Sequence, residues 1–590
     1  MKRKGFYQKK AWISAGLAIA LACAGLAGCG QDESSEGSEK SSEAETEEDA
    51  EASAVENEAE TVTCTLEYAG AEADEINEWQ ESTLYDVDAQ EAIAEDLESQ
   101  KDGQTLADPL VVYNPFGTNS QALYVYFTME EDASVSYTVS VSDEEVATIE
   151  DESLTSTSIA DFTRDVNDGE SASEFEFLLY GLIPDVENTV SITASYEDGS
   201  TETTTFACEM GSVLGDEELQ LSVTEGESDA ELEDGLYAVL SNSSAEVNFV
   251  YFYDNDGILR GEIPSIGGRS YRLIFEDDLL YLGITNYELA AINELGQVVK
   301  IYTLNEDGNY NQHHDYITDG EDHLIVLGTD GDSETVEDII LFVDKESGEI
   351  DSILDMGDLL PDYKESALEY YYANAEEEEE GGNFLGESGV DWIHLNAVAW
   401  AGDDSIIVSA REVSSVIKIS DVYGTPVIDY ILGSSEFWDG TGYEDLVYEQ
   451  SGDFTIQGGQ HGVMYGGTED LEDGQCYVYM FNNNIGTSST SSFDFSSIGL
   501  TNTTAASDEE GVYSYYYKYL VDENEGTFEL AESFEVPYSG FISSVQDIGD
   551  NEVVDSGNLS TFGEYDGDGV LIRQFSMNLD LIYRVYKYDL

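Results

Sequence analysis

The chain has 590 residues, of which 41% are hydrophobic, and a formal net charge of -107 at pH 7. This length and apolar content permit more than one domain with a sizeable core and exclude a chain that is disordered throughout. The charge argues against nucleic acid and anionic membrane surfaces as partners, because both would be repelled.

The N-terminus carries five Lys and Arg residues ahead of an apolar segment, residues 11–27, and the segment ends in Leu26-Ala27-Gly28-Cys29. This pattern is typical of a secretory signal with a lipobox, so residues 1–28 are predicted to be a lipoprotein signal peptide and Cys29 the lipidated first residue. A simple cleaved signal or an N-terminal membrane anchor is the alternative. The prediction places the protein outside the cytoplasm, lipid-anchored to the cell membrane in the cell envelope.

Residues 29–104 are predicted to be an acidic disordered tether and a poorly packed lead-in. From residue 30 to about residue 60 the chain is mainly Ser, Glu, Ala and Asp, which cannot bury a core. Residues 61–68 alternate like a strand, and residues 88–100 have helical composition.

Apart from Cys29, three cysteines remain after the signal, namely Cys64, Cys208 and Cys476. An odd number cannot form a complete disulfide framework, and the spacing fits no metal site. A bridge between Cys64 and Cys208 and isolated buried thiols both stay open.

Residues 105–212 are predicted to form a small β-sandwich. Strand-like alternation recurs along this segment, with turn signals such as Glu197-Asp198-Gly199 between the strands. Any immunoglobulin-like module would have the same pattern.

Residues 213–590 repeat a strand, a turn built on Asp or Asn with Gly, and a second strand. Hairpins repeated at intervals of tens of residues indicate a β-propeller. The turns lack the ligand series of a calcium loop and are interpreted as plain hairpin turns. They occupy residues 253–258, 292–297, 343–349, 420–425, 521–526 and 565–570.

One insertion, residues 365–380, interrupts the repeat with three consecutive tyrosines and a run of glutamates. It is predicted to be helical or disordered, and a solvated surface helix is favoured over an aromatic flap next to a binding site.

All five histidines lie between residues 313 and 461, and Arg411 is the only arginine between Arg272 and Arg573. Loops from successive propeller blades meet at one end of the axis, so these segments can share a pocket. Arginine matches two oxygens of a sulfate or phosphate at once, and neutral imidazole can act as nucleophile, base or acid. The residues therefore indicate sulfuryl or phosphoryl transfer, or hydrolysis.

Four motifs carry this pattern: His313-His314-Asp315, Asp391-Trp392-x-His394-x-Asn396, the run from Asp403-Asp404-Ser405 to Arg411, and Gln460-His461. Together, in this order and spacing, they make the chain resemble the bacterial aryl-sulfate sulfotransferase family over about residues 105–590. The resemblance implies an all-β fold, a six-bladed β-propeller preceded by a small N-terminal β-sandwich domain. The implied activity moves a sulfuryl group from a phenolic sulfate ester to an acceptor phenol.

The resemblance also implies roles for single residues. His461 would be the nucleophile that carries the sulfuryl group transiently, while His314, His394 and Arg411 would hold the sulfate oxygens, with a histidine able to move the phenolic proton. Asn396 is assigned to substrate binding in the same way.

Two further histidines are set aside. The family pattern keeps the histidine directly before Asp, which selects His314 over His313. His323 precedes Leu-Ile-Val and is interpreted as a strand residue that serves packing or solvent contact.

The chain departs from the family pattern after Arg411, where Glu412 begins a Glu-Val-Ser-Ser continuation instead of a His-Gln type one. An acidic residue beside the site leaves acceptor preference and anion affinity open. The chain has no Gly-rich, Lys-containing phosphate loop, so a nucleotide sulfate donor lacks its usual cradle. A direct ping-pong exchange between an aryl sulfate and a phenol fits better.

Two other classes stay open: a non-catalytic propeller scaffold lipoprotein, and a metal-dependent sulfatase or phosphatase with Asp315 or Asp391 among its ligands. The favoured hypothesis expects no cofactor and no metal. Its partners are a small aryl sulfate donor and a phenolic acceptor, no nucleic acid, and the membrane only through the lipid anchor, while a homodimer is left open.

Overall fold

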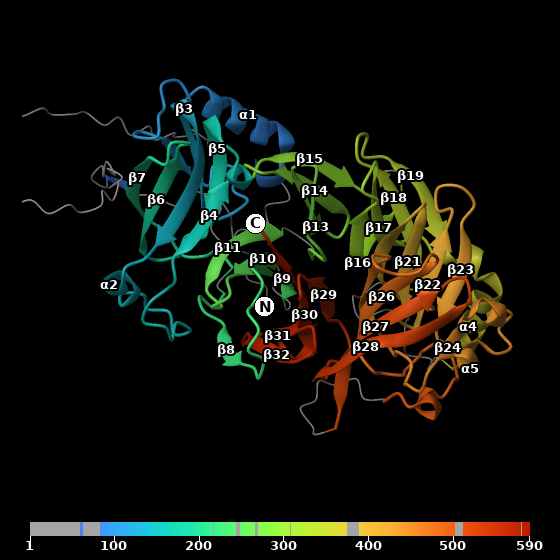
Figure 1. Cartoon of the computed structure of the whole chain (residues 1–590). Helices are drawn as coiled ribbons and strands as arrows, with labels where there is room; N and C mark the ends of the chain where they lie inside the picture. Colours follow the sequence, from blue (N-terminus) through green and yellow to red (C-terminus); the bar gives the residue numbers. More distant parts are fainter. Residues whose placement is uncertain are drawn as a thin grey trace, which may run out of the picture. The chain divides into compact units, whose positions relative to one another are not determined.

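Figure 1 shows the computed structural model, which describes residues 60–62, 83–215, 217–242, 248–265, 269–306, 308–374, 389–501, 511–579 and 581–590. The predicted signal peptide, Cys29, most of the tether and Cys64 lie outside the described residues. Within these ranges, no helix is long and apolar enough to cross a membrane.

The segment before the sandwich contains a 3-10 helix, η2 (Thr83–Tyr85), and helix α1 (Val87–Glu98). Buried Gln90 of α1 donates to the carbonyls of Leu84 and Phe116 at 2.8 and 3.0 Å and accepts from the Val298 amide at 3.2 Å. The predicted helix is therefore confirmed. The prediction of a poorly packed lead-in is wrong for residues 83–104, because the buried side-chain amide of Gln90 forms hydrogen bonds with both the sandwich and the propeller.

The sandwich is built around one long strand, β3 (Ala122–Ser140). Its first half pairs with β2 (Leu110–Tyr113) and β5 (Ala172–Tyr180), and its second half pairs with β4 (Phe162–Val166) and β6 (Glu187–Ser195). Strand β7 (Thr201–Glu209) follows β6 in the sheet and pairs in parallel with the short strand β1 (Glu60–Val62). Side chains along β3 alternate between buried and partly exposed in its second half, as expected for a strand with one face in a core.

Two short helical segments, α2 (Asp143–Val146) and η3 (Asn167–Gly169), connect strands of the sandwich. Cys208 is buried in β7, and Cys476 is buried in a propeller strand.

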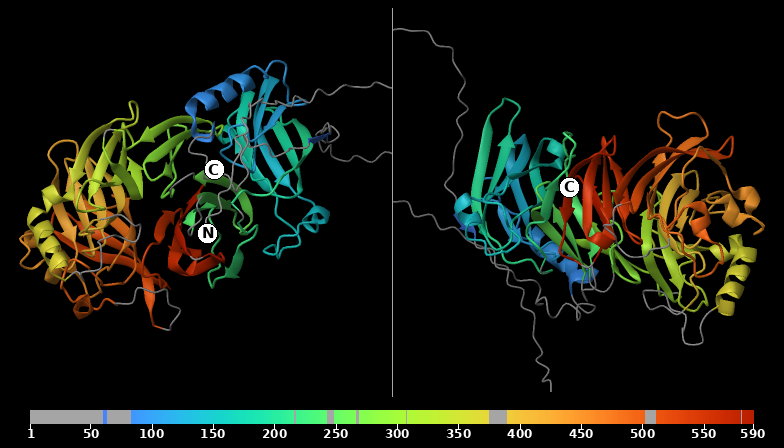
Figure 2. Two further views of the ribbon diagram at one scale, coloured as in Figure 1. Left: turned by 180° about the vertical axis from the view of Figure 1, so that it is seen from behind. Right: turned by 90° about the horizontal axis from the view of Figure 1, so that it is seen from below.

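Six sheets of four or five strands follow the sandwich, in chain order, and Figure 2 shows them arranged as the blades of a propeller. The first three sheets contain the following strands: β9 (Leu236–Asn242), β10 (Asn248–Tyr253) and β11 (Leu259–Ser265) with β33 (Ile582–Tyr588); β12 (Ile274–Glu276), β13 (Leu279–Thr285), β14 (Glu288–Asn293) and β15 (Val298–Thr303); and β16 (Tyr310–Thr318), β17 (His323–Asp330), β18 (Ile339–Asp344) and β19 (Ile350–Asp355).

The last three sheets contain these strands: β20 (Leu395–Gly402), β21 (Ser405–Ala410), β22 (Ser415–Ser420) and β23 (Val427–Leu432); β24 (Glu449–Ser451), β25 (His461–Gly467), β26 (Gln475–Asn482), β27 (Tyr513–Asp522) and β28 (Thr527–Pro537); and β29 (Ser544–Ile548), β30 (Asn551–Ser556), β31 (Thr561–Asp566) and β32 (Leu571–Ser576) with β8 (Ser222–Glu225). The short helical segments α5 (Ser435–Trp438), η4 (Glu444–Leu446), η5 (Phe495–Ile498) and η6 (Gly557–Leu559) lie in the connections. The all-β prediction of a sandwich followed by a propeller is confirmed.

The six Asp/Gly or Asn/Gly turns of the sequence occupy equivalent places in the six sheets. Each joins the third and fourth strands counted from the inner edge, as between β10 and β11 or between β14 and β15. In the first of them the Asp254 carboxylate accepts from the amides of Asp256 and Ile258, while Gly257 adopts a φ of 71°. The hairpin interpretation is confirmed, because the aspartate accepts within its own turn and glycine supplies the left-handed position.

Both ends of the propeller sequence are paired across the closure of the ring. The C-terminal strand β33 pairs antiparallel with β9, and β8, the first strand of this part, pairs antiparallel with β32. Strand β33 thereby becomes the inner strand of the first sheet and contacts β29, the inner strand of the last sheet.

The insertion between the third and fourth sheets contains α3 (Met356–Leu359) and α4 (Pro361–Asn374). Helix α4 buries Tyr363 and Ala367 against a core that includes Trp392, whereas Tyr372 is 59% exposed. The favoured surface helix is confirmed over this range, and residues 375–388 lie outside the described part.

Candidate active site

The four predicted catalytic residues lie at the same end of neighbouring sheets. His314 is in β16, His394 directly precedes β20, Arg411 directly follows β21, and His461 begins β25. The Arg411 amide donates to the His394 carbonyl at 3.0 Å, and the ring centroids of His314 and His394 are 4.8 Å apart. Segments that are distant in the sequence thus converge, because the inner strands β20 and β25 begin here and the inner strand β16 has a register irregularity around His314.

Several non-glycine residues at this end have left-handed backbone. The φ angles are 56° at His314, 58° at Glu337, 54° at His394 and 56° at Ile542. Such positions cost about 1–3 kcal/mol each, and for a β-branched residue such as Ile542 they are rare. The surrounding sheets hold these residues in conformations that aim their side chains and amides at one place.

His461 is held in one tautomer. Its Nδ1 lies 3.0 Å from the Gly459 carbonyl and 2.9 Å from Asn483 Oδ1. The Asn483 amide nitrogen donates to two backbone carbonyls, Ser539 and Ile542, which fixes its oxygen toward the histidine. Because both partners of Nδ1 are acceptors, Nδ1 carries the proton and Nε2 carries the lone pair.

The charge state of His461 follows from its surroundings. Burial lowers its pKa to about 3, and the positive charges of His394 and Arg411 contribute in the same direction against the hydrogen bond to Asn483. Among the described residues, the Nε2 lone pair receives one long contact, 3.3 Å, from the Ile542 amide. A neutral imidazole with an available Nε2 is a competent nucleophile throughout the physiological pH range.

His394 is protonated, in contrast to the neutral His461. Its Nδ1 lies 2.6 Å from Asp391 Oδ2 and 2.7 Å from Glu337 Oε2. Burial by itself lowers the pKa of His394, but the two carboxylates outweigh it and raise the pKa to about 10. His394 is therefore an imidazolium that can donate a proton and stabilise negative charge.

The pKa values of the two carboxylates, Asp391 and Glu337, are shifted in opposite directions. Burial and the charge of Glu337 raise the pKa of Asp391 to about 6, against the opposing effect of His394. Burial also opposes ionisation of Glu337, but His394 and His314 hold its pKa well below the usual range. Glu337, which is 1% exposed, is thus a permanent anion below the histidines.

His314 is neutral, and its side chain is 12% exposed. Burial lowers its pKa well below the ordinary value, because the charge of Glu337 only partly compensates. Its Nδ1 is 3.0 Å from Nδ1 of His313, which lies behind it and is 1% exposed. Of His313 and His314, it is His314 whose ring lies next to that of His394, which agrees with the selection of His314 from the sequence.

Arg411 forms an ion pair with the residue that departs from the family pattern. Its Nη1 donates to Glu412 Oε2 at 3.0 Å. The other oxygen of Glu412 accepts from Ser488 Oγ and Ser489 Oγ, each at 2.9 Å, and from the Thr490 amide at 3.2 Å. Glu412 therefore ties the loop of residues 488–490 to the arginine and leaves Nε and Nη2 of Arg411 unused among the described residues.

Asn396 is fully buried, and its Nδ2 donates to the Gln460 carbonyl at 2.9 Å. This contact positions the backbone that precedes His461. The side-chain nitrogen of Asn396 therefore forms a hydrogen bond within the protein, whereas the resemblance implied that Asn396 binds the substrate.

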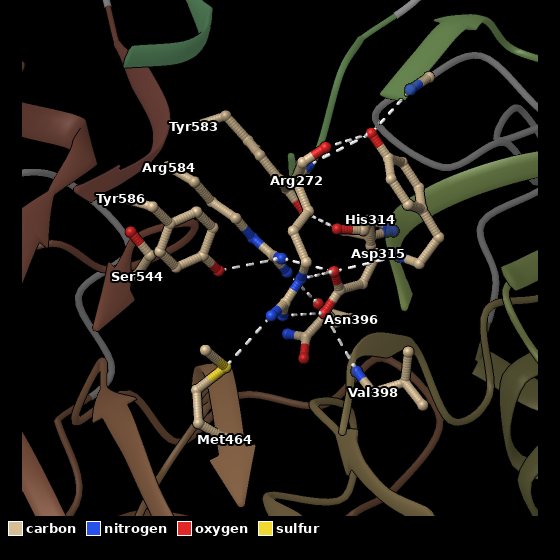
Figure 3. Close-up of polar contacts among 12 residues, drawn as sticks. Arg272, His314, Asp315, Asn396, Val398, Met464, Ser544, Tyr583, Arg584 and Tyr586 are labelled. Atoms are coloured by element: carbon tan, nitrogen blue, oxygen red, sulfur yellow. Dashed lines mark hydrogen bonds and ion pairs between the residues drawn. The ribbon is translucent and has the colours of Figure 1, made fainter. Parts of the chain in front are cut away.

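A buried charge cluster supports the site from within the propeller (Figure 3). Asp315 accepts from Arg272 at 2.9 and 3.0 Å, from Arg584 at 2.8 Å and from the Val398 amide at 3.1 Å. Arg584 also donates to the Asn396 carbonyl at 2.9 Å. Two guanidinium groups against one carboxylate leave a net positive charge here, which favours anions nearby.

Some of these residues were not predicted from the sequence. Glu337, Asn483 and the two arginines of the charge cluster were missed. A run of three asparagines, 482–484, at the end of a strand was the only visible signal for Asn483. The arginines could have been noticed because the chain contains few cations, and Glu337 had no signal among 127 acidic residues.

Two groups of ligand atoms among the described residues are close enough to hold a metal ion, and one is His314, Glu337 and His394, with all atoms within 4.8 Å. Asp315, an alternative ligand of the metal hypothesis, is committed to Arg272 and Arg584. His394 Nδ1 is already positioned between two carboxylates as a donor, so the charges of this group are balanced by a proton.

Fold and site together define a β-propeller protein in which histidines and arginines from separate sheets gather at one end of the inner strands. The sequence of residues 222–576 matches the family model described as arylsulfotransferase (ASST), and residues 110–211 match the arylsulfotransferase Ig-like domain. Since the first match covers more than half of the chain, the protein belongs to the arylsulfotransferase family and is a sulfotransferase.

No curated protein matches the chain. Solved structures with some similarity include the WD40 domain of Toxoplasma gondii coronin, with 9% identity, a TM-score of 0.30, and coverage of 61% of this chain and 77% of that one. A putative 6-phosphogluconolactonase from Bacteroides fragilis has 10% identity, a TM-score of 0.31, and coverage of 78% and 99%. Virginiamycin B lyase from Staphylococcus aureus has 10% identity, a TM-score of 0.28, and coverage of 60% and 99%. At these scores the similarities carry no argument.

Proposed function

We propose that this aryl sulfotransferase works by a ping-pong mechanism through a sulfohistidine at His461, without a nucleotide sulfate donor. The observation that carries the proposal is the pair of opposite charge states: His461 is neutral with Nε2 unprotonated, and His394 is protonated between Glu337 and Asp391. One group suits attack on sulfur, and the other suits protonation of the leaving oxygen.

In the first half-reaction, His461 Nε2 attacks the sulfur of the aryl sulfate as the bond between sulfur and the phenolic oxygen breaks. The departing phenolate takes the Nε2 proton of His394 and leaves as the phenol, while the Nδ1 proton stays with Asp391 and Glu337. The sulfuryl group stays on His461 Nε2, and the His461 Nδ1 proton, held by Gly459 and Asn483, supports the positive ring that this creates.

In the second half-reaction, the acceptor phenol gives its proton to His394, which is now neutral, and its oxygen attacks the sulfur. The bond between sulfur and Nε2 breaks, and its electron pair returns to His461. Arg411, through Nε and Nη2, and His314 are the groups that hold the three sulfuryl oxygens in both steps.

The test is turnover of 4-nitrophenyl sulfate with and without phenol, in the absence of any nucleotide. We expect sustained release of 4-nitrophenol and formation of phenyl sulfate only when phenol is present, because the sulfuryl group otherwise stays on the enzyme. Sustained hydrolysis without phenol would indicate a sulfatase, and loss of activity with a chelator would favour the metal-dependent alternative.

We also propose that the protein is a lipoprotein of the cell envelope, anchored through Cys29. Cys29→Ser is expected to move the protein from the membrane fraction to the soluble fraction while the specific activity stays unchanged, because the substituted residue lies far along the chain from every site residue. Fractionation followed by the 4-nitrophenyl sulfate assay measures both. Equal membrane retention of the variant would contradict a lipid anchor at this residue.

A further inference from the structure

We propose that the protein has a Zn²⁺ site outside the catalytic pocket, formed by His323, Asp344 and Asp351 at one end of the third propeller sheet. One ligand atom from each residue lies within 4.8 Å of the other two. This proposal is independent of the proposed reaction, since none of the three residues takes part in it.

The backbone places the three side chains together. His323 is the first residue of β17 and is paired in register with Asp344, the last residue of β18. Asp351 is the second residue of β19, at an irregularity where the register between β18 and β19 shifts. Directly opposed residues on neighbouring strands point to the same face, and the shift brings the third ligand to that face as well.

A further carboxylate, that of Asp319, orients the His323 ring. Asp319 Oδ2 lies 3.1 Å from His323 Nδ1, and it accepts from the Tyr423 hydroxyl at 2.6 Å. Asp319 Oδ1 accepts from two backbone amides, at 2.9 and 3.0 Å. With these donors holding it in place, the Asp319 carboxylate is positioned to accept from Nδ1–H of His323. A carboxylate behind a histidine in this way leaves Nε2 as the free ligand atom.

That Nε2 faces another anion. It lies 3.3 Å from Asp351 Oδ2, so in a neutral histidine a lone pair would point at a carboxylate oxygen. The Ser347 amide donates to Asp344 Oδ1, which holds the third ligand in position. A divalent cation between Nε2, Asp344 and Asp351 would replace the unfavourable contact between Nε2 and Asp351 with three metal–ligand bonds.

The donor set selects the metal. One imidazole nitrogen and two carboxylates suit Zn²⁺, with water completing the coordination, whereas Ca²⁺ and Mg²⁺ prefer oxygen ligands alone. Tyr423 follows β22 in the next sheet, and its ring lies 4.8 Å from that of His323. A metal here would therefore strengthen the contact between the third and fourth sheets.

The experiment is a calorimetric titration of the metal-free full-length protein with ZnCl₂. We expect one saturable site that is lost in His323→Gln and in Asp344→Asn, and Asp319→Asn should weaken it by about 10- to 100-fold. The matched control, Asp332→Asn, removes an exposed aspartate beyond the opposite end of β17 and should bind like the wild type. Unchanged melting of each variant without metal shows that its fold is intact.

The catalytic group His314, Glu337 and His394 is the competing location. Glu337→Gln should keep the Zn²⁺ site, and zinc should raise the melting temperature of this variant as much as that of the wild type. Loss of the site in Glu337→Gln with retention in His323→Gln would overturn the proposal. Absence of saturable binding to the wild type would overturn it too.

Discussion

Replacement of His461 by Asn is expected to lower turnover by about 10⁴-fold or more and to abolish covalent labelling of the protein by an aryl sulfate. Without Nε2, sulfur has no attacking group in the pocket. With donor alone, the wild type should release about one phenol per active site in a burst and then stop, because only slow transfer to water can regenerate it.

The adduct is measured by mass spectrometry of the peptide that contains Gln460-His461-Gly462. One added SO₃ group is expected on the wild-type peptide and none on the His461→Asn peptide, with digestion kept neutral or alkaline because sulfohistidine should be labile in acid. Glu334→Gln, at an exposed position, serves as the control that keeps burst and adduct. A burst that survives in His461→Asn, or an adduct on His314 or His394, would show that the nucleophile is another residue.

Much of the fold could be predicted because short sequence patterns determine its strands and turns. The six turns recur once per sheet, and alternation along the strands marks the sandwich. The pairing of β33 with β9 and of β8 with β32 could not be predicted, since strands separated by more than 300 residues have no local signal for their register. The anchoring of α1 by Gln90 was missed for a related reason: a single polar residue reveals its partners only in the folded state.

The candidate site was predictable in its residues but not in its charge states. Family motifs singled out His314, His394, Arg411 and His461, and the structure brings these four together. The motifs assigned no charge state to His394, which is protonated because Glu337, from the loop before β18, and Asp391 both face its Nδ1. Protonation depends on burial and on distant carboxylates, and a sequence shows neither.

Glu337→Gln is expected to lower the rate of the first half-reaction by about 10²-fold and to move its alkaline limit to lower pH. The substitution keeps the size of the side chain and removes its charge. Two carboxylates hold the pKa of His394 at about 10. With one charge removed, the imidazolium loses stabilisation relative to the imidazole, so the pKa of His394 falls. The proton donor is then lost at a lower pH than in the wild type.

A merely structural role for Glu337 is separated from this positioning role by comparing two donors in single-turnover experiments across pH. The phenol released from 4-nitrophenyl sulfate is more acidic than the one released from phenyl sulfate and needs less help from His394, so the loss should be larger with phenyl sulfate. Glu334→Gln, on the same loop but exposed, should behave like the wild type with both donors. Equal losses for the two donors with an unshifted pH profile would mean that Glu337 supports the fold of the loop and that the proton comes from elsewhere.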